Sequence, residues 1–185
     1  LSLHDALPIY DAAGIAHGLC KPFGNGAFVK SPRTLLGNGG AARAVLVALR
    51  MVNIANVRIQ ARDIAQALKL AVEFGLEEGP RTFDMPIDSE GLVNATPVGM
   101  PGVEPFPFDI AAMPKGGWVF DMVTEPAETP LLHSAQARGL ATKGEAEGYD
   151  PGIDVEAIAP RGEGRACARW YWNSARLTNR AFDPR

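Results

Sequence analysis

Residues 35–45, with the sequence LLGNGGAARAV, constrain the fold of this chain more than any other segment. A short apolar run leads into Gly37, Gly39 and Gly40, and residues 41–52 then contain neither Gly nor Pro. A strand, a glycine turn and a helix in this order hold the diphosphate of a dinucleotide. Gly37 allows the tight turn, Gly39 lets backbone N–H groups approach the phosphates, and the helix start attracts the anion. The segment therefore predicts a dinucleotide site, although such glycine turns also occur for purely structural reasons.

The rest of the chain alternates between strand and helix patterns. Strands are expected at 33–36, 56–60, 92–95 and 118–123, with a possible short one near Thr82. Helices are expected at 11–23, 41–52, 63–75 and 129–139, the third opened by a capping box of Asp63 and Gln66. Ala42 stands where the glycine fingerprint needs a small residue for helix and strand to pack. Alternation of this kind predicts an α/β fold, a Rossmann-type doubly wound parallel sheet.

Two charged residues follow the second expected strand, where the ribose of the adenosine arrives in such folds. An acid here accepts hydrogen bonds from a 2′-hydroxyl, whereas an arginine pairs with a 2′-phosphate. The chain has both, Arg62 and Asp63, side by side. Asp63 is equally well explained as a helix cap, and Arg62 as a surface charge, so both alternatives stay open.

The composition excludes several classes of function. The net charge of −3 over 185 residues gives no reason to expect nucleic acid or an anionic membrane as a partner. Cys20 and Cys167 are far apart, which predicts neither a disulfide framework nor a metal site and favours a cytoplasmic location. No apolar run is long enough to span a bilayer. Residues 161–185 are rich in Arg and contain neighbouring aromatics, but an unpatterned tail of this kind is more often solvated than bound to nucleic acid.

Three segments in the right order resemble the cofactor half of the shikimate dehydrogenases. They are GNGGAARAV (37–45), NATPVGM (94–100) and FDMVTEPAETPLL (120–132), and the resemblance extends over residues 10–140. It implies an enzyme of two α/β domains that binds its substrate between them. The implied reaction is the reversible NADPH-dependent reduction of 3-dehydroshikimate to shikimate, in the biosynthesis of aromatic amino acids.

The resemblance also implies which residues bind the cofactor. The diphosphate loop matches at Gly37, Asn38, Gly39, Gly40 and Ala41. At the ribose phosphate the family has Asn-Arg-Thr and a second Arg; here Arg62 is kept, Asp63 replaces the Thr and Gln66 replaces the second Arg. An acid beside a 2′-phosphate is repulsive, so NADP is the expected cofactor and NAD is possible.

Further implied positions lie after the later strands. Asn94 and Thr96 belong to the cofactor-binding motif, and Met122 matches the methionine near the nicotinamide. Thr124 stands at a substrate-lining position where the family commonly has Tyr, which leaves quinate possible as the substrate.

The expected catalytic machinery is incomplete in this chain. Asp11 matches the catalytic, substrate-binding Asp of the family. The family's catalytic Lys has no counterpart, because Lys21 and Lys30 do not match it. The N-terminal substrate domain is thus expected to be largely missing, and the chain is expected not to turn over by itself. A non-catalytic dinucleotide-binding module is the alternative.

The sequence predicts four regions. Residues 1–9 resemble a foreign leader, with a truncated upstream domain as the alternative; 10–29 form a linking helix; 30–140 form the Rossmann domain; and 141–185 form an atypical tail, disordered or out of frame. A small-molecule substrate is the only partner expected, no metal site is expected, and the sequence does not predict an oligomeric state.

Overall fold

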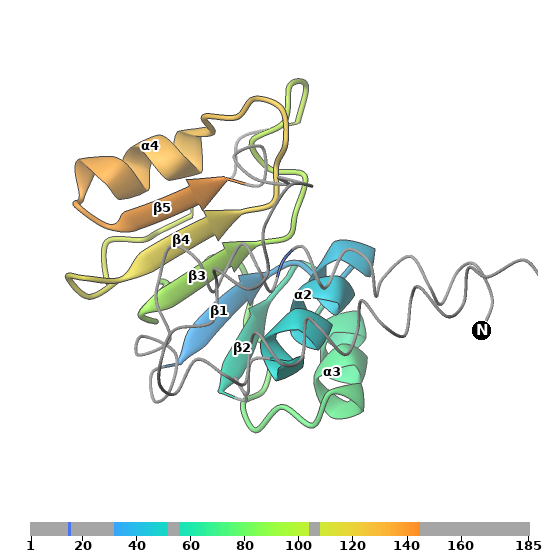
Figure 1. The fold of residues 1–185 in the computed structure, drawn as a ribbon. Coiled ribbons are helices and arrows are strands. Elements are labelled where there is room, and N and C mark those ends of the chain that lie inside the picture. Colours follow the sequence, from blue (N-terminus) through green and yellow to red (C-terminus); the bar gives the residue numbers. More distant parts are fainter. Residues whose placement is uncertain (1–14, 16–31, 52–55, 104–107, 145–185) are drawn as a thin grey trace, which may run out of the picture.

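The computed structural model describes residues 15, 32–51, 56–103 and 108–144 of the chain (Figure 1). The predicted leader at 1–9, the predicted helix over 11–23 apart from Ile15, and the chain after residue 144 lie outside the described residues. The strands are β1 (Arg33–Leu36), β2 (Val57–Gln60), β3 (Gly91–Asn94), β4 (Trp118–Asp121) and β5 (Ala141–Gly144). The helices are α2 (Gly40–Met51), α3 (Ile64–Glu73) and α4 (Pro130–Ala137).

The strands form one five-stranded parallel sheet in the order β2-β1-β3-β4-β5. After β1 the chain moves outward to β2 and then returns to place β3 on the other side of β1. The strand order therefore reverses between β1 and β3, which is the point where open α/β sheets bind their ligands. The expected parallel α/β sheet is confirmed.

The helices cover both faces of the sheet, as a doubly wound fold requires (Figure 1). Leu35, Val93 and Phe120 belong to one buried cluster together with residues of α2 and α3. Their strand neighbours Leu36 and Val119 belong to a second cluster with residues of α4. Because successive side chains of a strand point to opposite faces, α2 and α3 lie on one face and α4 lies on the other.

Helix α2 is held by an almost continuous apolar surface. Ala42 is fully buried in the first cluster, which confirms that its small side chain permits close packing of helix and sheet. The same cluster includes Ile15, whose exposed fraction is 1%. The exposed ends of α2 and α3 are further linked by an ion pair between Arg43 and Glu73.

The predicted strand near Thr82 is only a single bridge in the structure. The Arg81 N–H donates to the Ile59 carbonyl at 2.8 Å, and the Arg81 carbonyl accepts from the Ala61 N–H at 3.0 Å. Pro80 and Pro86 flank this bridge, and proline has no N–H to extend a ladder. The sheet therefore has a sixth position beside β2 that pairs through one residue.

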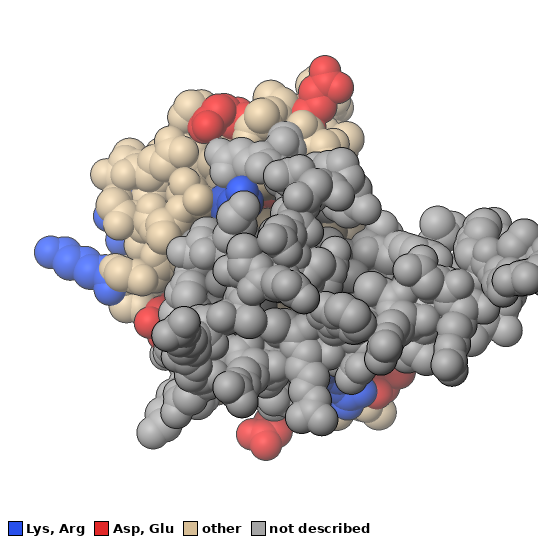
Figure 2. Space-filling view, viewed as in Figure 1, with Lys and Arg blue, Asp and Glu red and all other residues tan. Residues whose placement is uncertain are grey.

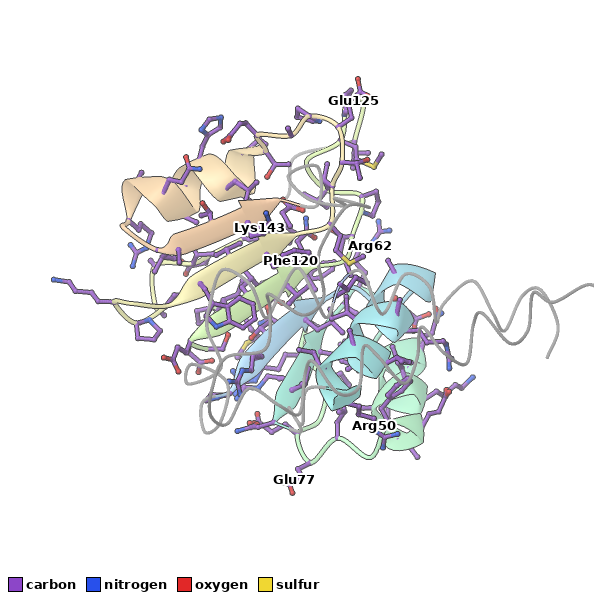
Figure 3. The ribbon with its side chains drawn as sticks, viewed as in Figure 1. Arg50, Arg62, Glu77, Phe120, Glu125 and Lys143 are labelled. Carbon is purple, nitrogen blue, oxygen red and sulfur yellow. The ribbon has the colours of Figure 1, made fainter. Side chains whose placement is uncertain are left out.

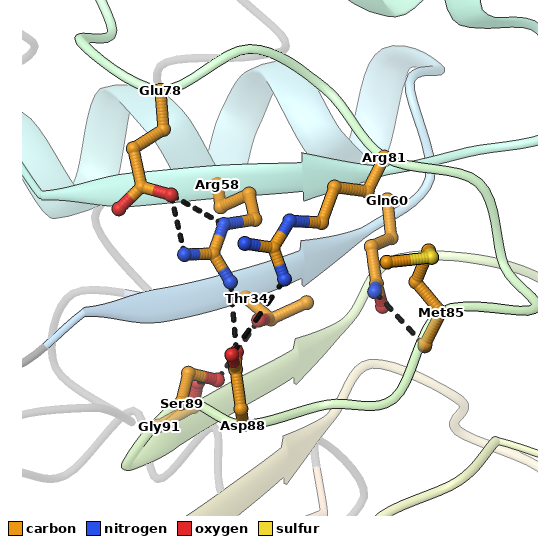
Figure 4. Close-up of polar contacts among 9 residues, drawn as sticks. All are labelled: Thr34, Arg58, Gln60, Glu78, Arg81, Met85, Asp88, Ser89 and Gly91. Carbon is orange, nitrogen blue, oxygen red and sulfur yellow. Dashed lines mark hydrogen bonds and ion pairs between the residues drawn. The ribbon is translucent and has the colours of Figure 1, made fainter.

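A polar cluster lies on β2, on the sheet face opposite α2 and α3 (Figure 4). We call it the Arg58 cluster; it consists of Arg58, Glu78, Arg81 and Asp88. Arg58 is 7% exposed and pairs with Glu78 and, at 2.8 Å, with Asp88. Arg81 approaches the second oxygen of Asp88 at 3.6 Å. Paired charges thus occupy the part of this face that is farthest from α4.

The sheet continues beyond residue 140, where the sequence predicts the end of the domain. Strand β5 pairs in parallel with β4, from Trp118↔Ala141 to Asp121↔Gly144. Its sequence, ATKG, has no apolar alternation and its first residue is exposed, so the local pattern gives little sign of a strand. The other elements agree with expectation except at their ends: the strand predicted to reach residue 123 ends at Asp121.

Candidate functional site

The carboxyl ends of the parallel strands lie along one edge of the sheet, toward which the arrowheads point in Figure 1. Four connections leave the sheet at this edge: residues 37–40 after β1, 61–63 after β2, 95–99 after β3 and 122–129 after β4. They contain all the predicted cofactor and substrate positions that the structure describes, except Ala41 at the start of α2 and Asn94 at the end of β3.

Gly37 forms the turn that the sequence predicts. Its φ is +103°, a backbone conformation that side chains disfavour. A Cβ at this position would also lie 3.0 Å from the Ala95 carbonyl oxygen and 3.1 Å from Cγ2 of Thr96. The Gly37 N–H donates to the Gln60 carbonyl at 2.8 Å. The turn therefore touches both neighbouring strands, and only glycine fits there.

Gly39 and Gly40 differ from Gly37, because they face open space. Both are exposed, and a Cβ on either would meet no other described atom within 4 Å. Gly40 is the first residue of α2, and the first N–H groups of a helix have no acceptor inside it. The backbone donors of Gly39, Gly40 and Ala41 thus lie at an exposed surface. This arrangement fits the diphosphate of a dinucleotide.

The glycine turn is connected to the segment after β2 by side chains. The Asn38 amide donates to the Asp63 carbonyl at 2.9 Å, and the Gln66 amide approaches the Asn38 carbonyl at 3.5 Å. Oδ1 of Asp63 accepts from the Gln66 N–H at 2.9 Å, so Asp63 is the N-cap of α3, as predicted. Asn38 therefore fixes the turn relative to the start of α3.

Arg62 is exposed at the same edge, near the start of α2 (Figure 3). Asp63 uses one carboxylate oxygen as the helix cap. In the 61–63 connection, Arg62 is the cationic residue, and its side chain is exposed to solvent. The positions of both residues agree with a ribose site, while their contact with a ligand remains a prediction.

Asn94 lies at the end of β3 and is completely buried. Its amide nitrogen donates to Oδ1 of Asp121 at 2.9 Å and to the Val98 carbonyl at 3.1 Å. Its amide oxygen accepts from the Thr96 N–H at 3.1 Å and from the Thr96 hydroxyl at 2.6 Å. Both ends of the amide are therefore used inside the protein. Asn94 can influence a cofactor only through the connection that it shapes.

Asp121, at the end of β4, is a buried acid that the sequence analysis does not single out. Its Oδ1 accepts from Asn94 and, at 3.1 Å, from the Val123 N–H, and its Oδ2 accepts from the Thr129 hydroxyl at 2.6 Å. Burial raises the pKa of the carboxyl, and these hydrogen bonds lower it by less. An acid that ends the otherwise apolar strand WVFD is the signal that sequence reasoning could have used.

The remaining predicted positions lie on the connection after β4 and upstream of the sheet. Met122 is half-buried and packs against the buried cluster that the sheet forms with α2 and α3. Its N–H donates to the Asn94 carbonyl at 3.0 Å. Thr124 is exposed. Asp11 lies outside the described residues.

Among the described residues, neither a broad charged patch on the face in Figure 2 nor a metal-binding cluster is seen. On the face shown in Figure 2, the described acidic and basic side chains form separate spots and no broad patch of one sign. Within residues 32–51, 56–103 and 108–144, no three His, Cys, Asp or Glu side chains gather closely enough to hold a metal ion. None of the described helices has the length and apolarity needed to cross a membrane.

The reversed strand order, the glycine turn beside it and the exposed start of α2 define a Rossmann-type α/β fold. Comparison with known proteins gives its relatives. No family model matches the chain. The shikimate dehydrogenase (NADP(+)) of Sphingopyxis alaskensis is 37% identical over 150 residues, which are 80% of this chain and 52% of that protein. The corresponding protein of Mesorhizobium japonicum is 41% identical over 115 residues, 60% of this chain and 41% of that one.

Solved structures agree with this result. The shikimate 5-dehydrogenase of Thermus thermophilus, in complex with NADP(H) and shikimate, is 27% identical with a TM-score of 0.55, over 87% of this chain and 62% of that one. The quinate dehydrogenase of Corynebacterium glutamicum, in complex with NAD, is 25% identical with a TM-score of 0.63, over 91% and 60%. The chain is therefore homologous to the shikimate dehydrogenases over 60–80% of its own length. It spans about half the length of the curated relatives that it matches.

Proposed function

We propose that the chain is the dinucleotide-binding part of an NADP(H)-dependent shikimate dehydrogenase, whose complete form reversibly reduces 3-dehydroshikimate to shikimate. The observation that carries the proposal is the glycine turn. Its exposed donors lie at the reversal of strand order, in a chain whose curated relatives are named shikimate dehydrogenase (NADP(+)). The wide separation of Cys20 and Cys167 supports a cytoplasmic location.

Each part of the proposed site has a separate task. The backbone of Gly39 to Ala41 binds the diphosphate, and Arg62 pairs with the 2′-phosphate. Met122 and Thr96 lie on the connections that would face the nicotinamide. The cofactor, when bound, supplies or accepts the hydride. Thr124 and Asp11 remain the predicted substrate contacts, and Asp11 is also the predicted catalytic group.

NADP is favoured over NAD by the way in which Arg62 and Asp63 are arranged. One oxygen of Asp63 caps α3, whereas the Arg62 side chain is exposed to solvent. The acid is nevertheless adjacent to the proposed phosphate position, and it weakens the preference by repulsion. An NAD-dependent quinate or shikimate dehydrogenase is therefore the second candidate, and the similarity to a quinate dehydrogenase solved with NAD supports it.

The test is titration of the full chain with NADPH and NADH, followed by nicotinamide fluorescence. We expect NADPH to bind more tightly. Arg62→Gln should weaken NADPH binding by about tenfold or more, because an ion pair with phosphate is lost, and should leave NADH binding unchanged. Asp63→Ser keeps a good N-cap, removes the negative charge and should strengthen NADPH binding. Arg138→Gln, at an exposed arginine after α4, is the matched control.

Each outcome assigns the cofactor differently. Tighter binding of NADH would support the second candidate, and binding of neither nucleotide would overturn both. Addition of shikimate and NADP⁺ then tests turnover, which we expect to be absent. Formation of NADPH would contradict this expectation and demonstrate dehydrogenase activity in this chain, whereas binding without turnover agrees with a chain that carries only the dinucleotide-binding part of the enzyme.

A further inference from the structure

Asp121, Asn94 and Thr129 form a buried polar group at the carboxyl edge, which we call the Asp121 clamp. All three side chains have an exposed fraction of 0%. The Asn94 amide donates to Oδ1 of Asp121 at 2.9 Å, and the Thr129 hydroxyl donates to Oδ2 at 2.6 Å. One carboxylate thus joins the end of β3 to the start of α4.

The clamp also fixes the backbone of both connections at this edge. Through Asn94 it holds the Thr96 N–H and the Val98 carbonyl in the 95–99 connection. Asp121 itself accepts from the Val123 N–H in the 122–129 connection. These bonds join two segments that are separate in sequence. A shift of one connection must therefore strain the other.

Direct packing extends this linkage to the glycine turn. The position of a Cβ on Gly99, whose φ is +110°, is 3.4 Å from Cβ and Cγ2 of Thr129. At the other end of the same connection, Cγ2 of Thr96 is 3.1 Å from the position of a Cβ on Gly37. A series of close neighbours therefore leads from the start of α4, through Asp121 and Asn94, to the turn that starts the proposed diphosphate site.

The geometry suits an acceptor at both ends of the side chain at position 121. Its three partners are all donors, two at Oδ1 and one at Oδ2. An asparagine of the same size has only one acceptor oxygen, so it cannot accept at both ends. Burying the Asp121 carboxylate costs free energy of folding, since an unpaired charge is unfavourable in a protein interior. A role in placing neighbouring groups explains why an acid is there.

We propose that Asp121 is a positioning residue for the bound dinucleotide, acting through Asn94 and Thr129 to hold the 95–99 and 122–129 connections in place against the glycine turn. The inference rests on the function proposed above, and it concerns the nicotinamide half of the ligand. The adenosine half is held by separate contacts, because Asn38 and the Gly37 N–H attach the turn to the β2 side. Loss of the clamp therefore affects the two halves unequally.

The first experiment compares NADPH with 2′,5′-ADP, which carries only the adenosine half. Asp121→Asn should weaken NADPH binding about tenfold and reduce the enhancement of its nicotinamide fluorescence, while 2′,5′-ADP affinity changes less than about twofold. Asp109→Asn is the matched control, since Asp109 is exposed and also accepts one backbone N–H, from Ala111 at 2.9 Å. Equal losses for both ligands would indicate a merely structural role and overturn the inference, as would unchanged binding of both.

The second experiment follows amide hydrogen exchange without ligand. Thr129→Val removes the hydroxyl from Asp121 and should speed exchange of the Thr96 N–H, which lies two hydrogen-bonded side chains away. Ser134→Ala is the control, because among the described residues the Ser134 hydroxyl bonds its own helix, at the Pro130 carbonyl. Faster exchange confined to the first turn of α4 would overturn the inference. Failure of the unaltered chain to bind either nucleotide would instead overturn the proposed function, and the inference with it.

Discussion

Gly91 of β3 lies directly beside Trp118 of β4, and the indole ring occupies the space that a side chain on residue 91 would need. A Cβ on Gly91 would lie 2.3 Å from Cζ2 and 2.5 Å from Cε2 of Trp118, and 2.9 Å from Cγ of Arg33. Arg33, Gly91 and Trp118 are neighbours across three central strands. The glycine thus allows two of the largest buried side chains of the domain to meet over the sheet.

Gly91→Ala should therefore destabilise the domain. No van der Waals contact is as short as 2.3 Å, so Trp118 or the strand must move, and overpacking of this kind costs about 1–3 kcal/mol of the free energy of unfolding. Urea denaturation measures the loss. Gly79→Ala is the control, because a Cβ there meets no other described atom within 4 Å. Equal stability of the two variants would mean that the indole has room to move.

Gly40→Ala should have opposite effects on stability and on binding. Gly40 opens α2, its φ is not positive and its Cβ position is open, so alanine should be tolerated and can add up to about 1 kcal/mol through helix propensity. The new methyl group projects where the diphosphate is proposed to lie, and NADPH affinity should fall by about tenfold or more. Thermal unfolding and NADPH titration of one preparation check both effects. An unchanged dissociation constant would contradict the proposed diphosphate position.

Features set by local sequence were predictable. The turn at Gly37, the cap at Asp63 and the helix start at Thr129 each depend on a few adjacent residues, and the structure has all three. The expected strands at 33–36, 56–60, 92–95 and 118–123 could be predicted for the same reason, because apolar or alternating runs stood between turn residues. The family resemblance gave the order of the segments.

Features set by distant partners were not predictable. The role of Asp121 depends on Asn94, which is 27 positions away in sequence, and the need for glycine at position 91 depends on Trp118. Strand β5 lacks an apolar pattern and forms because β4 offers it an edge. The bridge at Arg81 consists of one paired residue, which is too short for any periodicity to reveal.

Arg58→Met should lower stability at neutral pH, because it leaves two carboxylates of the Arg58 cluster without their shared partner. The Asp88 side chain is 50% exposed, so screening limits the loss to about 1–2 kcal/mol. Burial raises the pKa of Asp88, but the hydrogen bond and charge of Arg58, with the charge of Arg81, hold it below 3.8 overall.

A folded-state pKa below the unfolded one stabilises the protein above the unfolded value, and this contribution is lost as the pH falls through the folded value. The difference between the unaltered chain and Arg58→Met should therefore shrink below pH 3.8. Urea denaturation at several pH values measures it, with Lys69→Met, on the exposed face of α3, as the control. A difference that grows on acidification would contradict the pairing.

Asp121 predicts the opposite dependence on pH. Burial raises the pKa of this carboxyl above its ordinary value of 3.8, and the hydrogen bonds from Thr129, Val123 and Asn94 offset only part of that effect. When the folded-state pKa is the higher one, the stabilising contribution is complete below the unfolded pKa and is lost as the pH rises through the folded one, by about 1.4 kcal/mol for each unit of difference.

The Asp121→Asn variant has no group that titrates at position 121. The stability of the unaltered chain relative to Asp121→Asn should therefore fall as the pH rises from 3.8 through the raised pKa, and then level off. Urea denaturation of both proteins over this range measures the difference, in which the other titrating groups largely cancel. A difference that increases with pH would mean that the three donors outweigh burial and that the clamp favours the charged form of Asp121.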